Sequence, residues 1–145
     1  MTKKNIPAEL RRLVRGRAGD CCEYCCGQAK YSADSFSIDH IKPREQQGET
    51  EPGNLALSCL GCNQHKAKRT NAVDPVTSQV VSLFHPRQHR WEDHFEWNDD
   101  FTLMIGLTPI GRATIAALQL NRAGLVNLRR ILYDIGEHPP SNRES

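Results

Sequence analysis

The sequence has no long hydrophobic run and little excess charge, and both absences restrict what the chain does. No apolar stretch approaches the ~20 residues that a helix needs to cross a bilayer, and MTKKNIPAELRRL lacks the apolar core of a secretion signal. Aromatic residues make up only 6% of the chain, and a pI near 8.3 is too low to indicate nucleic-acid binding by itself. We therefore expect a soluble, cytoplasmic protein with no membrane partner. Its oligomeric state stays open.

The remaining composition, with 38% hydrophobic and 25% charged residues among 145, is typical of one globular domain. Helical spacing and proline predict a helix over 7–17, and apolar runs predict strands over 36–41 and 55–58. A helix is expected over 62–69, strands over 80–84 and 102–105, and two final helices between Thr108 and Gly136. These elements predict an α+β fold in which residues 1–73 and 74–145 pack as one compact domain.

Six cysteines lie in two tight groups, which favours metal binding over the spread pattern typical of disulfides. C-E-Y-C and C-L-G-C are two CxxC turns, and each can direct two thiolates at one ion. Four protein thiolates would complete a tetrahedron, so the zinc would be structural. Cys21 and Cys26 are adjacent spares, but pairing either within its group gives a longer spacing. The predicted ligands are Cys22, Cys25, Cys59 and Cys62.

The stretch FSIDHIKP, residues 36–43, places Asp39 and His40 side by side in an apolar run. On a regular strand their side chains point to opposite faces, so both reach one site only if the strand ends or bends near Pro43. Two asparagines, Asn54 and Asn63, stand in the same part of the chain, and Asn63 directly follows the last cysteine. A basic cluster comes next, made of Lys66, Lys68 and Arg69.

The pattern CEYC…IDHIKP…GNLALSCLGCNQHK, from about residue 20 to 69, resembles the zinc-containing HNH endonucleases. The resemblance implies the ββα-metal (His-Me finger) fold and hydrolysis of phosphodiester bonds with Mg²⁺ or another divalent ion. It implies that His40 is the general base, that Asp39 and Asn63 hold the ion, and that Asn54 orients the imidazole through the loop. The expected substrate is DNA, with RNA not excluded, and the basic cluster is expected to contact phosphates.

A rival hypothesis from another class is a non-catalytic zinc-knuckle module that binds nucleic acid without cutting it. Such a module needs the cysteines and the basic cluster, but has no use for Asp39, His40 and Asn63. Residues 74–136 also resemble an extension found on many bacterial HNH proteins, which carries no assignable role. Within it, HPRQH has the spacing of a helical metal site, but Pro86 argues against a helix and favours a structural role for His85 and His89.

Overall fold

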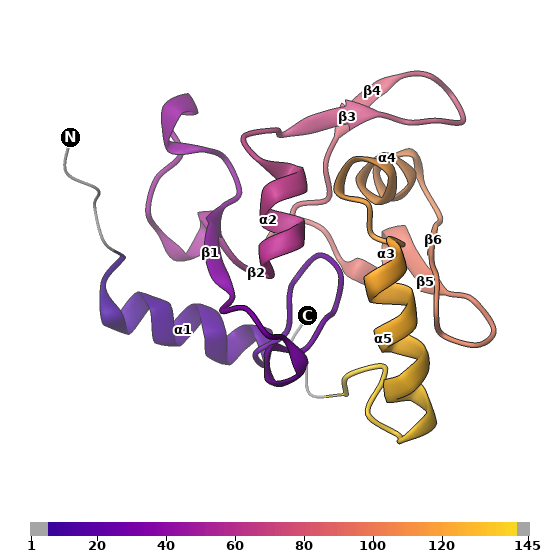
Figure 1. Cartoon of the computed structure of the whole chain (residues 1–145). Helices are drawn as coiled ribbons and strands as arrows, with labels where there is room; N and C mark the ends of the chain where they lie inside the picture. The colour runs from indigo at the N-terminus through magenta and orange to yellow at the C-terminus, as the bar shows by residue number, and fades with distance from the viewer. Residues whose placement is uncertain (1–5, 142–145) are drawn as a thin grey trace.

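A computed structural model describes residues 6–141 and shows a mixture of helices and short strands (Figure 1). The first helix, α1 (Ala8–Ala18), is followed by Gly19, which adopts the left-handed conformation (φ 61°) that glycine tolerates. Three 3₁₀ turns lie at Ala29–Tyr31, Arg44–Gln46 and Pro52–Asn54. The helices and strands in chain order are α1 (Ala8–Ala18), β1 (Ser37–His40), β2 (Leu55–Ser58), α2 (Leu60–Lys66), β3 (Asn71–Val73), β4 (Val80–Ser82), α3 (Trp91–His94), β5 (Phe95–Trp97), β6 (Met104–Gly106), α4 (Pro109–Leu118) and α5 (Ala123–Asp134).

The first half of the chain is built on an antiparallel hairpin followed directly by a helix. β1 pairs with β2 in a register that sets Asp39 opposite Ala56 and His40 opposite Leu55. Every residue of β2 is buried, and α1 and α2 both lie against this hairpin. The loop at 41–54 joins the two strands, so it begins immediately after His40.

The second half adds two more hairpins, β3–β4 and β5–β6, and the helices α4 and α5. Asp74 anchors the turn after β3. Its carboxylate accepts from Arg112 Nε at 3.0 Å and Nη2 at 2.9 Å, and from the Thr77 hydroxyl at 2.8 Å. The guanidinium of Arg112 holds the pKa of Asp74 well below its usual range. This ion pair fixes α4 against the β3–β4 hairpin.

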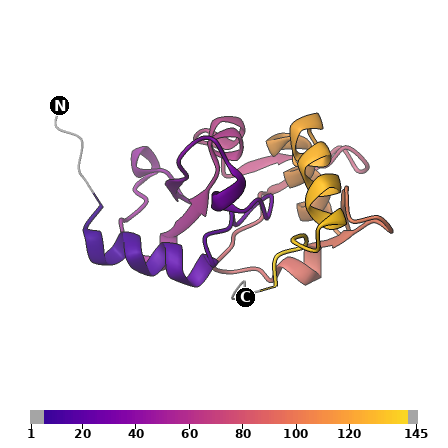
Figure 2. The same ribbon diagram turned by 60° about the horizontal axis from the view of Figure 1, so that its bottom comes forward.

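The two halves share one hydrophobic core. Val14 and Leu57 from the first half belong to the same buried cluster as Phe84, Leu118 and Leu120 from the second. Figure 2 shows α1 toward one end of the molecule and α5 toward the other. Residue 73 therefore divides the chain only in sequence, because side chains from both sides of it pack into the same core. Within residues 6–141, no helix is both long and apolar enough to span a membrane.

Candidate functional site

The four predicted cysteine ligands come together between the end of α1 and the start of α2. Their Sγ atoms all lie within 4.8 Å of one another, and Cys25 Sγ is 3.7 Å from Cys59 Sγ. Four sulfurs around one zinc at ~2.3 Å stand ~3.8 Å apart, so the spacing and the soft donor set fit this ion. Hydrogen bonds among the thiols, those with Cys22 first, lower the pKa of Cys59 and raise the pKa values of Cys25 and Cys62. Cys21 and Cys26 are buried but are not part of this group.

Asp39 lies on the buried face of β1, where its carboxylate is already engaged. Only 7% of the residue is exposed. Its Oδ2 accepts from the Tyr24 hydroxyl at 2.9 Å and lies 3.1 Å from Lys66 Nζ. Burial raises the pKa of Asp39, while the charge of Lys66 and the bond from Tyr24 oppose that rise. Asp39 is therefore held in place by Tyr24, from the turn between Cys22 and Cys25, and by Lys66 from α2.

Lys66 is interior, which does not fit the expected contact with phosphate. The residue is 1% exposed, and its Nζ donates to Ile41 O at 3.1 Å besides pairing with Asp39. Helical geometry turns this side chain toward β1 and not toward solvent. We assign Lys66 to an internal ion pair that joins α2 to the hairpin.

Replacing Lys66 with methionine is expected to destabilise the protein by about 3–5 kcal/mol, because the buried carboxylate of Asp39 would lose its counter-charge. Urea denaturation monitored by circular dichroism measures the loss. Lys68→Met is the control, since the Lys68 and Glu45 side chains are both largely exposed and their pair should contribute little. Equal stability of the two variants would contradict the internal role of Lys66.

His40 is the last residue of β1, directly after Asp39, and is half-buried. Its Nε2 is 2.9 Å from the Thr50 hydroxyl, which comes from the loop at 41–54. Burial lowers the pKa of His40, and the positive charge of Arg44 lowers it further. Both effects favour the neutral imidazole, and among residues 6–141 the ring hydrogen-bonds only to Thr50 of the loop.

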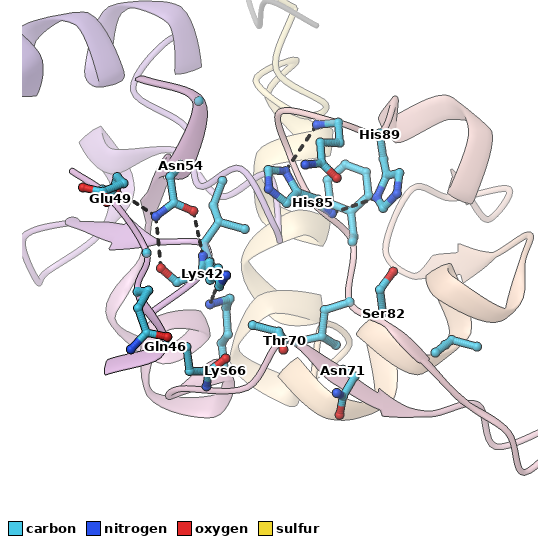
Figure 3. Close-up of a pocket in the computed structure, with 18 of the residues that line it drawn as sticks. Lys42, Gln46, Glu49, Asn54, Lys66, Thr70, Asn71, Ser82, His85 and His89 are labelled. Atoms are coloured by element: carbon cyan, nitrogen blue, oxygen red, sulfur yellow. Dashed lines mark hydrogen bonds between the residues drawn. The ribbon is translucent and has the colours of Figure 1, made fainter. Parts of the chain in front are cut away.

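The side chain of Asn54 closes that loop (Figure 3). Its Oδ1 accepts from Lys42 N at 2.8 Å, and its Nδ2 donates to Lys42 O at 3.0 Å and to Glu49 O at 2.9 Å. Asn54 also accepts the backbone N–H of Ile41 at 2.9 Å through its own carbonyl. Ile41 directly follows His40, and Glu49 directly precedes Thr50. The bonds made by Asn54 therefore fix the backbone next to both residues of the His40–Thr50 contact.

Replacing Asn54 with alanine is expected to lower stability by about 1–3 kcal/mol, because buried backbone groups lose their partners. If the loop positions His40, the phosphodiester hydrolysis implied by the HNH resemblance should fall as well, even at temperatures where the variant stays folded. Thermal denaturation and single-turnover cleavage measure the two effects separately. Asn127→Ala, on the exposed surface of α5, should change neither quantity. Unchanged cleavage by a folded Asn54→Ala variant would argue against a positioning role.

The remaining predicted residues lie on or after α2. Asn63 is half-buried, one turn before Lys66, and its side chain has no hydrogen bond to any residue in 6–141. Lys68 is exposed and pairs with Glu45 at 2.6 Å. The guanidinium of Arg69 donates to His65 O at 2.7 Å and to Ala117 O at 2.9 Å, which joins α2 to α4. Of the basic cluster, Lys68 and Arg69 reach the surface.

A cleft of about 790 Å³ separates the loop at 42–54 from the segment at 80–89 (Figure 3). It is not lined by Asp39, His40 or Asn63, so the candidate site is defined by the side-chain contacts above and not by this cleft. His85 and His89 border it. His85 Nδ1 accepts the backbone N–H of Arg87 and Gln88, and His89 Nδ1 accepts that of His85. These bonds fit the structural role expected for HPRQH.

Several residues at the site carry no local signal in the sequence. Tyr24 stands between two zinc-type ligands, and Thr50 lies in a polar loop. Arg122 and Arg129 come from the far end of the chain, yet Arg122 lies against the sulfurs of Cys59 and Cys62, and Arg129 donates to Cys25 O at 3.3 Å. Only the tertiary packing brings these two arginines to the cysteine cluster.

Comparison with known proteins agrees with this geometry. The model of the HNH endonuclease family matches residues 22–69. A protein of Vibrio cholerae serotype O1 biovar El Tor, named "Retron Vc95 putative HNH endonuclease", is 28% identical over 92 residues. That match covers 52% of this chain and 43% of the relative, so the chain spans less than half of the relative's length. No solved structure matches significantly. The resemblance to the HNH endonucleases is therefore confirmed, and it is carried by residues 22–69.

Proposed function

We propose that the chain is a metal-dependent endonuclease that hydrolyses DNA phosphodiester bonds. The observation that carries the proposal is the placement of His40. It stands at the end of β1 beside the buried Asp39, and Thr50 of the loop that Asn54 closes holds its ring. All of these residues lie within the segment that matches the HNH family. A module that only binds nucleic acid has no need of such an arrangement.

His40 is the proposed general base, which takes a proton from the attacking water. A general base works best when its pKa lies near the working pH and its free form dominates. The lowered pKa of His40 favours the neutral ring, in which a ring nitrogen can accept the proton. Thr50 and Asn54 are positioning residues in this scheme, since they act on the imidazole through the loop.

Asp39 and Asn63 are the proposed ligands of a catalytic divalent ion. Their carboxylate and amide oxygens are the hard donors that Mg²⁺ prefers. Asp39 Oδ2 is engaged by Tyr24 and Lys66, while its Oδ1 has no hydrogen bond to any residue in 6–141. Asn63 is on α2 one turn before Lys66, the residue that contacts Asp39, so the donor set fits. A bound ion would supply positive charge that stabilises the phosphate during hydrolysis.

The cysteine cluster is proposed to hold a structural zinc. Four thiolates from the protein complete the coordination of a tetrahedral ion, which leaves no position for water or substrate. The cluster joins the turn before β1 to the start of α2, so zinc would fix the two elements that flank the hairpin. In this proposal β1, β2 and α2 form a ββα-metal core, and the zinc supports it from outside.

Incubation of the purified protein with supercoiled plasmid tests the proposal. We expect nicked or linear DNA in Mg²⁺ or Mn²⁺ and none in EDTA, and parallel reactions with RNA define the substrate class. Retained DNA binding without cleavage in any divalent metal would favour the zinc-knuckle module. Cleavage that persists in EDTA would contradict the role of the divalent ion.

A further inference from the structure

Arg122, in the turn between α4 and α5, lies against the cysteine cluster. Its Nη2 is 3.5 Å from Cys59 Sγ and 3.7 Å from Cys62 Sγ, and its Nη1 is 3.6 Å from Cys62 Sγ. Both sulfurs come from C-L-G-C at the start of α2, some 60 residues earlier in the chain. The guanidinium is thus shared between the two thiols that α2 contributes.

The position of Arg122 is fixed by further bonds. Its Nη1 donates to Leu118 O at 3.3 Å and to Gln119 O at 3.1 Å, the carbonyls at the end of α4. The guanidinium is therefore held at the cluster by the C-terminal end of α4 and does not depend on the sulfurs alone. Because the Arg122 guanidinium is already held by these carbonyls, its side chain loses little further conformational freedom when it donates to sulfur.

Gly61, between the two cysteines of α2, makes this approach possible. A Cβ atom added at Gly61 would lie 2.5 Å from Arg122 Nη2, which is far inside van der Waals contact. The glycine of C-L-G-C therefore leaves room for the guanidinium from the other half of the chain. A larger residue would displace the end of the arginine side chain.

The charge of Arg122 suits a zinc bound by four thiolates. Such a complex carries an excess of negative charge, because four thiolates surround a divalent cation. N–H groups that donate to ligating atoms orient the ligands and tune the metal, and losing them commonly weakens metal binding about 10–100-fold. Arg122 supplies both a positive charge and N–H donors to the same pair of ligands.

We propose that Arg122 is an outer partner of the zinc site, a positioning residue that holds the thiolates of Cys59 and Cys62. This inference rests on the proposed zinc. It gives the extension after residue 74 a definite task, since the turn between α4 and α5 then determines how tightly the first half of the chain retains its metal.

Competition with a chromogenic chelator, using zinc and then Co²⁺ as the bound metal, tests this role. Arg122→Gln removes the positive charge and the paired N–H donors of the guanidinium. Gly61→Ala leaves the arginine in the sequence but blocks its approach. We expect about a 10-fold or larger loss of zinc affinity in both variants, together with altered sulfur-to-cobalt absorption. Arg130→Gln is the matched control, because Arg130 is exposed on α5 and donates to Asn127.

Gly61→Ala separates the inference from a general effect on folding. Alanine favours a helix over glycine, so a merely structural Gly61 should give a variant that is as stable as wild type or more so. Unchanged metal affinity in Gly61→Ala would overturn the inference, even if Arg122→Gln weakens binding or unfolds. A wild-type protein that binds no zinc would instead refute the zinc proposal itself, so the two failures are distinguishable.

Discussion

Replacing His40 with alanine is expected to slow the cleavage of plasmid DNA by about 10²–10⁴-fold, the usual contribution of a positioned general base. The physical reason is the loss of a neutral imidazole that can accept a proton at pH 7. Because His40 is half-buried and its ring hydrogen-bonds only to Thr50 among residues 6–141, folding and DNA binding should change little. Single-turnover cleavage at saturating protein measures the effect, and a gel-shift assay measures binding.

His65→Ala is the control for this experiment, since His65 is an exposed histidine on α2. It should cleave at nearly the wild-type rate under the same metal conditions. A His40→Ala protein with full activity would refute the assignment of the base. Loss of DNA binding together with cleavage would place His40 in substrate contact rather than in proton transfer.

Removing the proposed zinc from the cysteine cluster is the second change with a large expected effect. Structural zinc in small modules contributes about 10–16 kcal/mol of apparent binding free energy at neutral pH, as much as the whole stability of an ordinary domain. We therefore expect Cys59→Ser, or prolonged exposure to a strong chelator, to unfold residues 22–69 and to abolish cleavage. Circular dichroism and metal analysis, with about one zinc per chain in the wild type, measure both consequences.

Cys21→Ser provides the matched control for the zinc prediction. Cys21 is buried near the cluster but lies outside the group of four, and its Sγ donates to Gly19 O at 3.4 Å. The variant should retain its zinc and most of its stability. A Cys59→Ser protein that is folded, zinc-free and active would show that the cluster does not support the fold.

Much of the hairpin and of the cysteine cluster follows from local sequence. β2 has the expected bounds, and β1 falls within the expected strand, because apolar runs bounded by Pro43 and by a glycine-containing loop favour short strands. The spacing of the CxxC turns correctly separates the four clustered cysteines from Cys21 and Cys26. These features depend on neighbours in the chain, which a sequence displays directly.

Features that depend on tertiary packing were not predictable. The three-residue strands β3 and β5 gain their pairing only from β4 and β6, and their own sequences carry too few residues to show a period. Lys66 belongs to a basic cluster in the sequence, yet the packing of α2 on β1 buries it as the counter-charge of Asp39. Arg122 reaches the cysteines because the turn between α4 and α5 packs against the start of α2, and no sequence spacing indicates this contact.

The shared core has a consequence for gene fusion and for fragment design. A gene trimmed to residues 22–69 would encode the whole matched segment, but it would leave out Phe84, Leu118 and Leu120, which complete the core. It would also lose Arg129, whose buried guanidinium bridges Cys25 O and Leu120 O. The smallest fragment expected to fold by itself therefore extends through α5, and chimaeras joined near residue 70 should express as insoluble chains.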